Sequence, residues 1–394
     1  MQNQDSGYKW YVLALVVLTN MFVNAMPAMG MSVLAKEISQ DLNMDVVQVG
    51  IVWGIVSLPA IFTSLLGGSI GDKLGPKRVL IMGSLTAGLL GAARGLATSF
   101  EAMLGIVIVL GGLIPFVAMN GIKVAGQWFP SSQLGLANGL LSMGMALGFL
   151  LGSMLSATVL SPLLGGWRNV LMMYGLLGAL FSIPWAFVRV ASSPQHQNDE
   201  ALSLRAVVWR VVRIKNVWLL ALTLFGVGGS IQSILGYLPL YLRNIGWDAI
   251  QADGTLTAFH TASLIFVMPI ALWSDRLRSR KGLLLVTALL VMTGTGLLSV
   301  VSGSWIWAAV LMAGFVRDGF MAILLTMVIE VDGVGSAYAG TAMGFVMALS
   351  GIANTIAPPL GNSLAHLSPS MPFVLWAAWA LFGVICLALV KRKT

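Results

Sequence analysis

The chain has 394 residues, of which 58% are hydrophobic and 9% are charged, with a formal net charge of +8. Soluble globular domains carry about 25% charged residues, and the mean hydropathy here is +0.90. This composition excludes a soluble protein and indicates an integral membrane protein. The positive charge does not indicate nucleic-acid binding, because the cations lie mainly in short segments between apolar runs. Cys386 is the single cysteine, which excludes an intramolecular disulfide.

Twelve apolar runs are long enough to span a bilayer, which takes about 20 residues. We therefore predict an all-α membrane protein with twelve transmembrane helices in two six-helix bundles. In chain order the predicted spans cover residues 9–34, 46–70, 79–98, 103–127, 134–160, 168–188, 217–242, 255–274, 282–302, 305–329, 337–361 and 371–390.

The longest polar interval runs from Arg189 to Lys215 and divides the spans six and six. It predicts an N-terminal bundle at 1–190, a linker at 191–215 and a C-terminal bundle at 216–394. Within the linker, Leu204, Val207, Val208, Val211 and Val212 form one apolar stripe, and the cations lie elsewhere on the helical wheel. This pattern favours a helix lying on the inner membrane surface. An early start to the seventh span is the alternative.

The distribution of Lys and Arg predicts the orientation of the chain, because short cytoplasmic loops are enriched in these residues. With the N-terminus inside, sixteen of the 22 cations lie on the cytoplasmic side. Four lie near the other face, namely Lys36, Arg94, Arg168 and Arg243, and two lie within spans, namely Lys123 and Arg317. We expect a multi-pass protein of the cell (inner) membrane with both termini in the cytoplasm.

Two basic turns occupy equivalent places in the two halves. Residues 68–78 read Gly-Ser-Ile-Gly-Asp-Lys-Leu-Gly-Pro-Lys-Arg, and residues 273–281 read Trp-Ser-Asp-Arg-Leu-Arg-Ser-Arg-Lys. Gly75 and Pro76 suit a tight turn. We predict that the charged residues of both turns act as a cytoplasmic gate, through contacts that form only when that face is closed. The predicted gating residues are Asp72, Lys73, Arg78, Asp275 and Arg276.

The first turn resembles the loop signature between helices two and three of the major facilitator superfamily, Gly-x-x-x-Asp-Arg/Lys-x-Gly-x-Arg/Lys-Arg/Lys. The second turn resembles the decayed repeat of that signature between helices eight and nine. This resemblance implies the major facilitator fold, with pseudo-symmetric halves and a substrate cavity lined by helices one, four, seven and ten. It says little about the substrate.

The tenth span carries Arg317 and Asp318. Arg317 lies about 18 Å along a helix from Trp305, close to the bilayer centre. A charge at that depth normally faces a partner or a wet cavity. We therefore expect Arg317 to contact substrate and Asp318 to respond to protons. The alternative is an Arg–Asp pair with a purely architectural role.

Lys123 is the second cation within a span, and Asn120 lies one turn away on the same helical face. Their segment resembles the fourth helix of anion-transporting branches of the superfamily, where an Arg or Lys in this position meets the substrate. We therefore include Lys123 and Asn120 among the substrate-binding residues. The alternative for Lys123 is snorkelling, since it lies roughly 7 Å inside the cytoplasmic boundary.

Five further polar residues complete the candidate site. Asn20 and Asn24 share a face of the first span just before Pro27, and Gln232 and Tyr237 lie on the seventh span. All four are predicted to bind substrate, with interhelical hydrogen bonds as the alternative. His260 is a candidate for proton coupling, because histidine titrates near neutrality. Its alternative is a packing role.

No nucleotide-binding Gly-x4-Gly-Lys-Ser/Thr sequence and no metal-ligand cluster is present, so we predict no cofactor. The sequence favours a monomeric secondary transporter that moves a small organic anion by alternating access, coupled to protons or by exchange. Efflux of amphipathic or cationic compounds is the first alternative. A polytopic membrane enzyme is the second, but its loops would need carboxylate or histidine clusters that these short loops lack.

Overall fold

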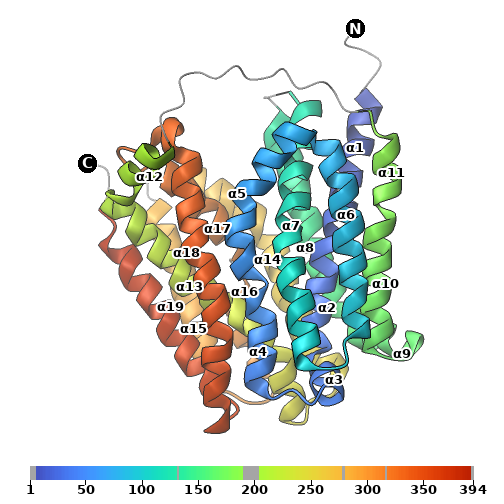
Figure 1. The fold of residues 1–394 in the computed structure, drawn as a ribbon. Helices are drawn as coiled ribbons and strands as arrows, with labels where there is room; N and C mark the ends of the chain where they lie inside the picture. The colour runs from blue at the N-terminus through green and yellow to red at the C-terminus, as the bar shows by residue number, and fades with distance from the viewer. Residues whose placement is uncertain (1–5, 131–132, 190–203, 277–279, 316, 392–394) are drawn as a thin grey trace. The chain divides into compact units, whose positions relative to one another are not determined.

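The computed structural model describes residues 6–130, 133–189, 204–276, 280–315 and 317–391, which form helices joined by short turns (Figure 1). In that part of the chain, eleven helical stretches are long and apolar enough to cross a membrane. Helix α14 (Ala249–Arg276) has 28 residues and occupies the place of the remaining predicted span. The prediction of an all-α membrane protein is confirmed.

The chain divides into two compact units. The first comprises Met1–Asp45, Ile55–Gln195 and Asp248–Thr257, and the second comprises Val46–Gly54, His196–Trp247 and Ala258–Thr394. The start of the second span therefore groups with the C-terminal helices, and the start of α14 groups with the N-terminal helices. The single boundary expected at the linker stays a prediction.

The helices of the first unit follow the first six predicted spans, several of them broken by turns or short irregular segments. They are α1 (Ser6–Asn20), a π-helical turn (Met21–Ala25), α2 (Met26–Val33), α3 (Ala35–Asp41), α5 (Ser57–Leu74), α6 (Pro76–Ala93), a 3-10 turn (Arg94–Leu96), α7 (Phe100–Trp128), α8 (Leu134–Leu155), a second π-helical turn (Ser156–Leu160), α9 (Ser161–Leu164), α10 (Trp167–Leu180) and α11 (Ser182–Phe187).

The second unit contains a short helix from the linker, the last six spans and the first part of the second span. Its helices are α4 (Val46–Ile55), α12 (Leu204–Val212), α13 (Lys215–Asn244), the remainder of α14, α15 (Arg280–Leu297), α16 (Trp305–Gly314), α17 (Arg317–Ile329), α18 (Gly335–Ser363), a 3-10 turn (Leu364–His366) and α19 (Met371–Leu389).

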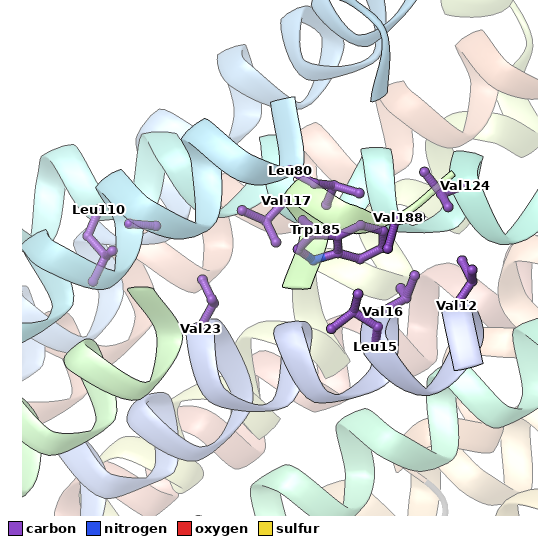
Figure 2. Close-up of a cluster of buried hydrophobic side chains, with 11 residues drawn as sticks. Val12, Leu15, Val16, Val23, Leu80, Leu110, Val117, Val124, Trp185 and Val188 are labelled. Carbon is purple, nitrogen blue, oxygen red and sulfur yellow. The ribbon is translucent and has the colours of Figure 1, made fainter. Parts of the chain in front are cut away.

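A buried apolar cluster joins the helices of the first unit around Trp185 of α11 (Figure 2). Valines and leucines of α1, α6 and α7 surround the indole ring. Its Nε1 donates a hydrogen bond to Thr19 Oγ1 at 2.9 Å, so the one polar atom of the ring is satisfied inside the core. This contact ties α11 to α1, two helices at opposite ends of the first six spans.

Glycines set the closest approach between α6 and α10. A Cβ on Gly175 of α10 would lie 2.0 Å from the backbone nitrogen of Ala92, and one on Gly88 of α6 would lie 2.2 Å from that of Ala179. Small residues at such contacts let two membrane helices pack backbone against backbone. The pairing of α6 with α10 therefore depends on the absence of side chains at these two positions.

The basic turn between α5 and α6 has the structure that its glycine and proline predict. Helix α5 ends at Leu74, Gly75 takes a positive φ of 82°, and α6 begins at Pro76. A positive φ favours glycine, and proline suits the first position of a helix because its missing N–H would be unpaired there. This turn leaves Asp72 on the last turn of α5.

Candidate functional site

Arg317 begins α17, and the packing of α14 against α16 and α17 brings His260 close to it. A Cβ on Gly314 would lie 2.8 Å from the Cα of Phe259, and one on Gly319 would lie 2.9 Å from Ile270. His260 follows Phe259 directly and is buried. Two residues predicted separately, one for substrate and one for protons, therefore lie on neighbouring helices of the second unit.

Three predicted residues have side chains outside the described part of the chain. They are Asp318, the neighbour of Arg317, and the two gating residues of the second basic turn, Asp275 and Arg276. Their predicted roles stay predictions.

Lys123 of α7 forms an ion pair with Asp72 of α5. Lys123 Nζ lies 2.6 Å from Asp72 Oδ1, and the two side chains are 32% and 74% exposed. The carboxylate of the first basic turn therefore binds a cation 51 residues later in the chain. Lys73 and Arg78, the other two gating candidates of this turn, are exposed and form no ion pair with residues that the structure describes.

Asn120, one turn before Lys123, is fully buried where α7 meets α5. Its Nδ2 donates to the backbone oxygens of Gly67 at 3.0 Å and Phe116 at 2.8 Å. A Cβ on Gly71 would lie 1.8 Å from Asn120 Oδ1, so this glycine of the first turn leaves room for the amide. Asn120 thus holds α5 against α7 and positions Asp72 beside Lys123.

The asparagines of the first span flank a π-helical turn. Asn20 donates to the backbone oxygen of Val16 at 3.0 Å, and Asn24, within the turn, lies 3.9 Å from the sulfur of Met145. A thioether is a weak acceptor. Local π turns are frequent at functional sites. The side-chain amide of Asn24 therefore retains more hydrogen-bonding capacity for a ligand than that of Asn20.

The candidates of α13 have different environments. The hydroxyl of Tyr237 donates to the backbone oxygen of Pro369 at 2.9 Å, and its ring packs among Tyr241, Phe373 and Trp376. This hydroxyl is engaged in holding the fold together. The backbone oxygen of Gln232 accepts from Trp53 Nε1 at 2.7 Å, while the half-buried Gln232 side chain makes no hydrogen bond with described residues.

Comparison with known proteins settles the family. The sequence matches the Major Facilitator Superfamily over residues 13–331 and 244–394. The chain belongs to the major facilitator superfamily. A probable sulfoacetate transporter of Cupriavidus necator is 26% identical, over 93% of this chain and 90% of the relative. The 4-hydroxybenzoate transporter of Pseudomonas aeruginosa is 22% identical, over 70% of this chain and 68% of the relative.

A solved structure, that of the nucleoside transporter NupG, has a TM-score of 0.82 to this chain at 12% identity and covers 97% of this chain and 100% of its own. At that identity the likeness shows the major facilitator fold alone. Family and fold together make the protein a multi-pass membrane transporter and not an enzyme.

The sequence did not predict that Arg94 is buried. Arg94, at the end of α6, is 4% exposed; its Nε donates to the backbone oxygen of Gly91 at 3.1 Å, and its Nη2 has no partner among described atoms. The sequence placed Arg94 near the outer membrane face, where a long side chain normally reaches water. Only the packing of α6 against α10 shows that it is enclosed.

The ion pair between Asp72 and Lys123 leads to a prediction about transport rate. Asp72→Asn is expected to shift the resting protein towards the inward-open state and to slow transport, while substrate affinity changes less than a few-fold. A pair this exposed contributes only about 0.2–1 kcal/mol to stability, so the fold is retained.

Cysteine accessibility on both membrane faces measures the shift. Lys123→Gln serves as the matched variant, because it removes the other half of the pair and is expected to give the same shift. The double variant Asp72→Asn with Lys123→Gln should then show little more shift in accessibility than either single variant. Unchanged accessibility in Asp72→Asn would contradict a gating role.

Proposed function

We propose that this transporter carries a small organic anion, with a carboxylate-like group, by alternating access. The observation that carries the proposal is Arg317, a cation in the middle of the tenth span, which packs against the helix that carries the buried His260. A guanidinium holds a carboxylate through two parallel hydrogen bonds. The names of the relatives support the same class of cargo, since sulfoacetate and 4-hydroxybenzoate are organic acids.

We further infer different roles for the two cations that lie within spans. Arg317 is the proposed anion-binding group. Lys123 carries a carboxylate partner at 2.6 Å, which favours a role in the first basic turn over one in the substrate site. Asn24 in the first unit and Gln232 in the second are the other proposed substrate-binding residues, because neither amide is saturated by strong hydrogen bonds to described residues.

We propose that the protein lies in the inner membrane with both termini on the cytoplasmic side. It rests on the excess of Lys and Arg in the segments assigned to that side. We also propose a monomer as the working unit.

A screen of the purified protein by thermal shift tests the class of cargo. A ligand that binds the folded state raises the free energy of unfolding by RT ln(1 + [L]/Kd), and the melting temperature rises with it. Carboxylates and sulfonates are expected to stabilise the protein, whereas neutral sugars, nucleosides and lipophilic cations are not. Stabilisation by lipophilic cations alone would support efflux of such compounds and overturn the anion proposal.

Coupling to protons is proposed through Asp318, with His260 as the second candidate. A proton on His260 and the guanidinium of Arg317 repel each other, and a bound anion attracts both. Proton and anion would therefore favour each other's binding, which is the linkage that symport needs.

Asp318→Asn is accordingly expected to abolish uphill, proton-driven uptake into vesicles while exchange of labelled for unlabelled substrate persists, because exchange needs no net proton movement. His260→Gln is the matched variant. Loss of uphill uptake in His260→Gln alone would assign the proton to the imidazole. Retention of uphill uptake with unchanged pH dependence in both variants would exclude both residues and assign the proton to another group.

A further inference from the structure

Helix α12 and the segment that follows it are rich in cations and contain no acidic residue. Residues 201–218 contain Arg205, Arg210, Arg213 and Lys215 and no Asp or Glu. Arg210, Arg213 and Lys215 are exposed and form no ion pair with residues that the structure describes. In the same unit Arg280 pairs with Glu330, and Lys281 donates to the backbone oxygens of Ala388 and Val390. Among the described residues of this unit, Arg210, Arg213 and Lys215 therefore form a group of exposed cations without a carboxylate beside them.

A fourth cation joins this group from the other end of the unit. Asn216 Nδ2 lies 3.4 Å from the backbone oxygen of Lys391, and the backbone nitrogen of Lys391 lies 3.4 Å from Asn216 Oδ1. Lys391 is exposed and follows α19. The contact brings it next to Lys215. We call Arg210, Arg213, Lys215 and Lys391 the α12 basic cluster.

The same surface presents apolar rings. Trp209 is 60% exposed, and the guanidinium of Arg213 lies over its ring, 4.9 Å from the centroid. Trp218 is partly exposed, and its Nε1 donates to the backbone oxygen of Val212 at 2.7 Å. Tryptophan with Lys or Arg beside it is the composition of the membrane–water interface, where the ring enters the lipid boundary and the charge meets the headgroups.

Helix α12 is held in place on the unit. It packs on α18, as Figure 1 shows, and the buried Val211 faces inward. The guanidinium of Arg210 lies over the ring of Tyr338, 4.8 Å from its centroid. Arg213 and Trp209 therefore remain on the outer side of a fixed helix, in a position to meet the membrane.

We propose that the α12 basic cluster and Trp209 form a binding surface for anionic phospholipid headgroups of the cytoplasmic leaflet. Charge complementarity carries the assignment, since the four cations have no acidic partner among the described residues and the leaflet is negative, and Trp209 supplies the apolar anchor. Each Lys or Arg near such a surface contributes roughly fivefold in affinity. The proposal goes beyond the transported cargo and does not depend on it.

The test titrates the full chain in detergent with phosphatidylglycerol and with phosphatidylcholine, counting bound lipid by native mass spectrometry. The parent is expected to bind phosphatidylglycerol at least tenfold tighter at low salt. The double change Arg213→Gln with Lys215→Gln is expected to lower that affinity roughly 25-fold and to leave phosphatidylcholine binding unchanged. Trp209→Ala is expected to weaken both lipids, because insertion of the ring is independent of headgroup charge.

Lys77→Gln with Arg189→Gln is the control, since it removes two charges from cytoplasmic segments of the first unit. It is expected to change phosphatidylglycerol affinity less than threefold. Equal affinity for the two lipids, an equal loss in the control, or no effect of Trp209→Ala would each overturn the proposal. Displacement of the lipid by millimolar inorganic phosphate would also overturn it, because the surface would then be a site for free phosphate.

Discussion

Arg317→Lys is expected to weaken the binding of a carboxylate ligand by roughly ten- to a hundredfold, although the charge is kept. An ammonium cannot reproduce the two parallel hydrogen bonds of a guanidinium. The loss corresponds to one charge-assisted hydrogen bond of about 1.5–3 kcal/mol. A binding titration with any anion found by thermal shift measures it.

Lys123→Arg is the matched control for this prediction. It preserves the charge opposite Asp72, whose carboxylate accepts either cation, so anion affinity is expected to stay within a few-fold of the parent. If Arg317→Lys binds like the parent while remaining folded, Arg317 has an architectural role, and the proposed anion site fails with it.

The second large effect concerns the stability of the first unit. Gly175→Val is expected to lower the stability of the protein by about 1–3 kcal/mol or more, because the new side chain must push α6 away from α10. The clash is with backbone, 2.0 Å from the nitrogen of Ala92, so no side-chain rotation relieves it. The melting temperature in detergent and the yield of monodisperse protein are the measurements.

Gly105→Val supplies the control, since a Cβ at Gly105 of α7 has no neighbour within 4 Å. This variant is expected to melt within a degree or two of the parent. Equal melting temperatures for the two valine variants would show that α6 and α10 are not packed as closely as the structure has them.

The sequence alone determined the class of fold, one of its turns and the helix of the linker. Apolar runs of spanning length predict helices, because every backbone polar group in the bilayer must be satisfied within its own segment. The turn at Gly75 and Pro76 follows from the φ preferences of these two residues. The amphipathic pattern of residues 204–212 likewise predicts the helix that becomes α12. Each of these signals is local, so it can be read without knowing which helices meet.

The tertiary structure decided which polar residues are engaged and which are open to a ligand. It pairs Lys123 with Asp72, places His260 near Arg317, and assigns the hydroxyl of Tyr237 to the backbone of Pro369. It also encloses Arg94, which the sequence left at the membrane face. These partners lie far apart in the chain, and their contacts depend on the rotation of each helix about its axis. That rotation is set by close packing at residues such as Gly175 and Gly314, through contacts that no single helix contains.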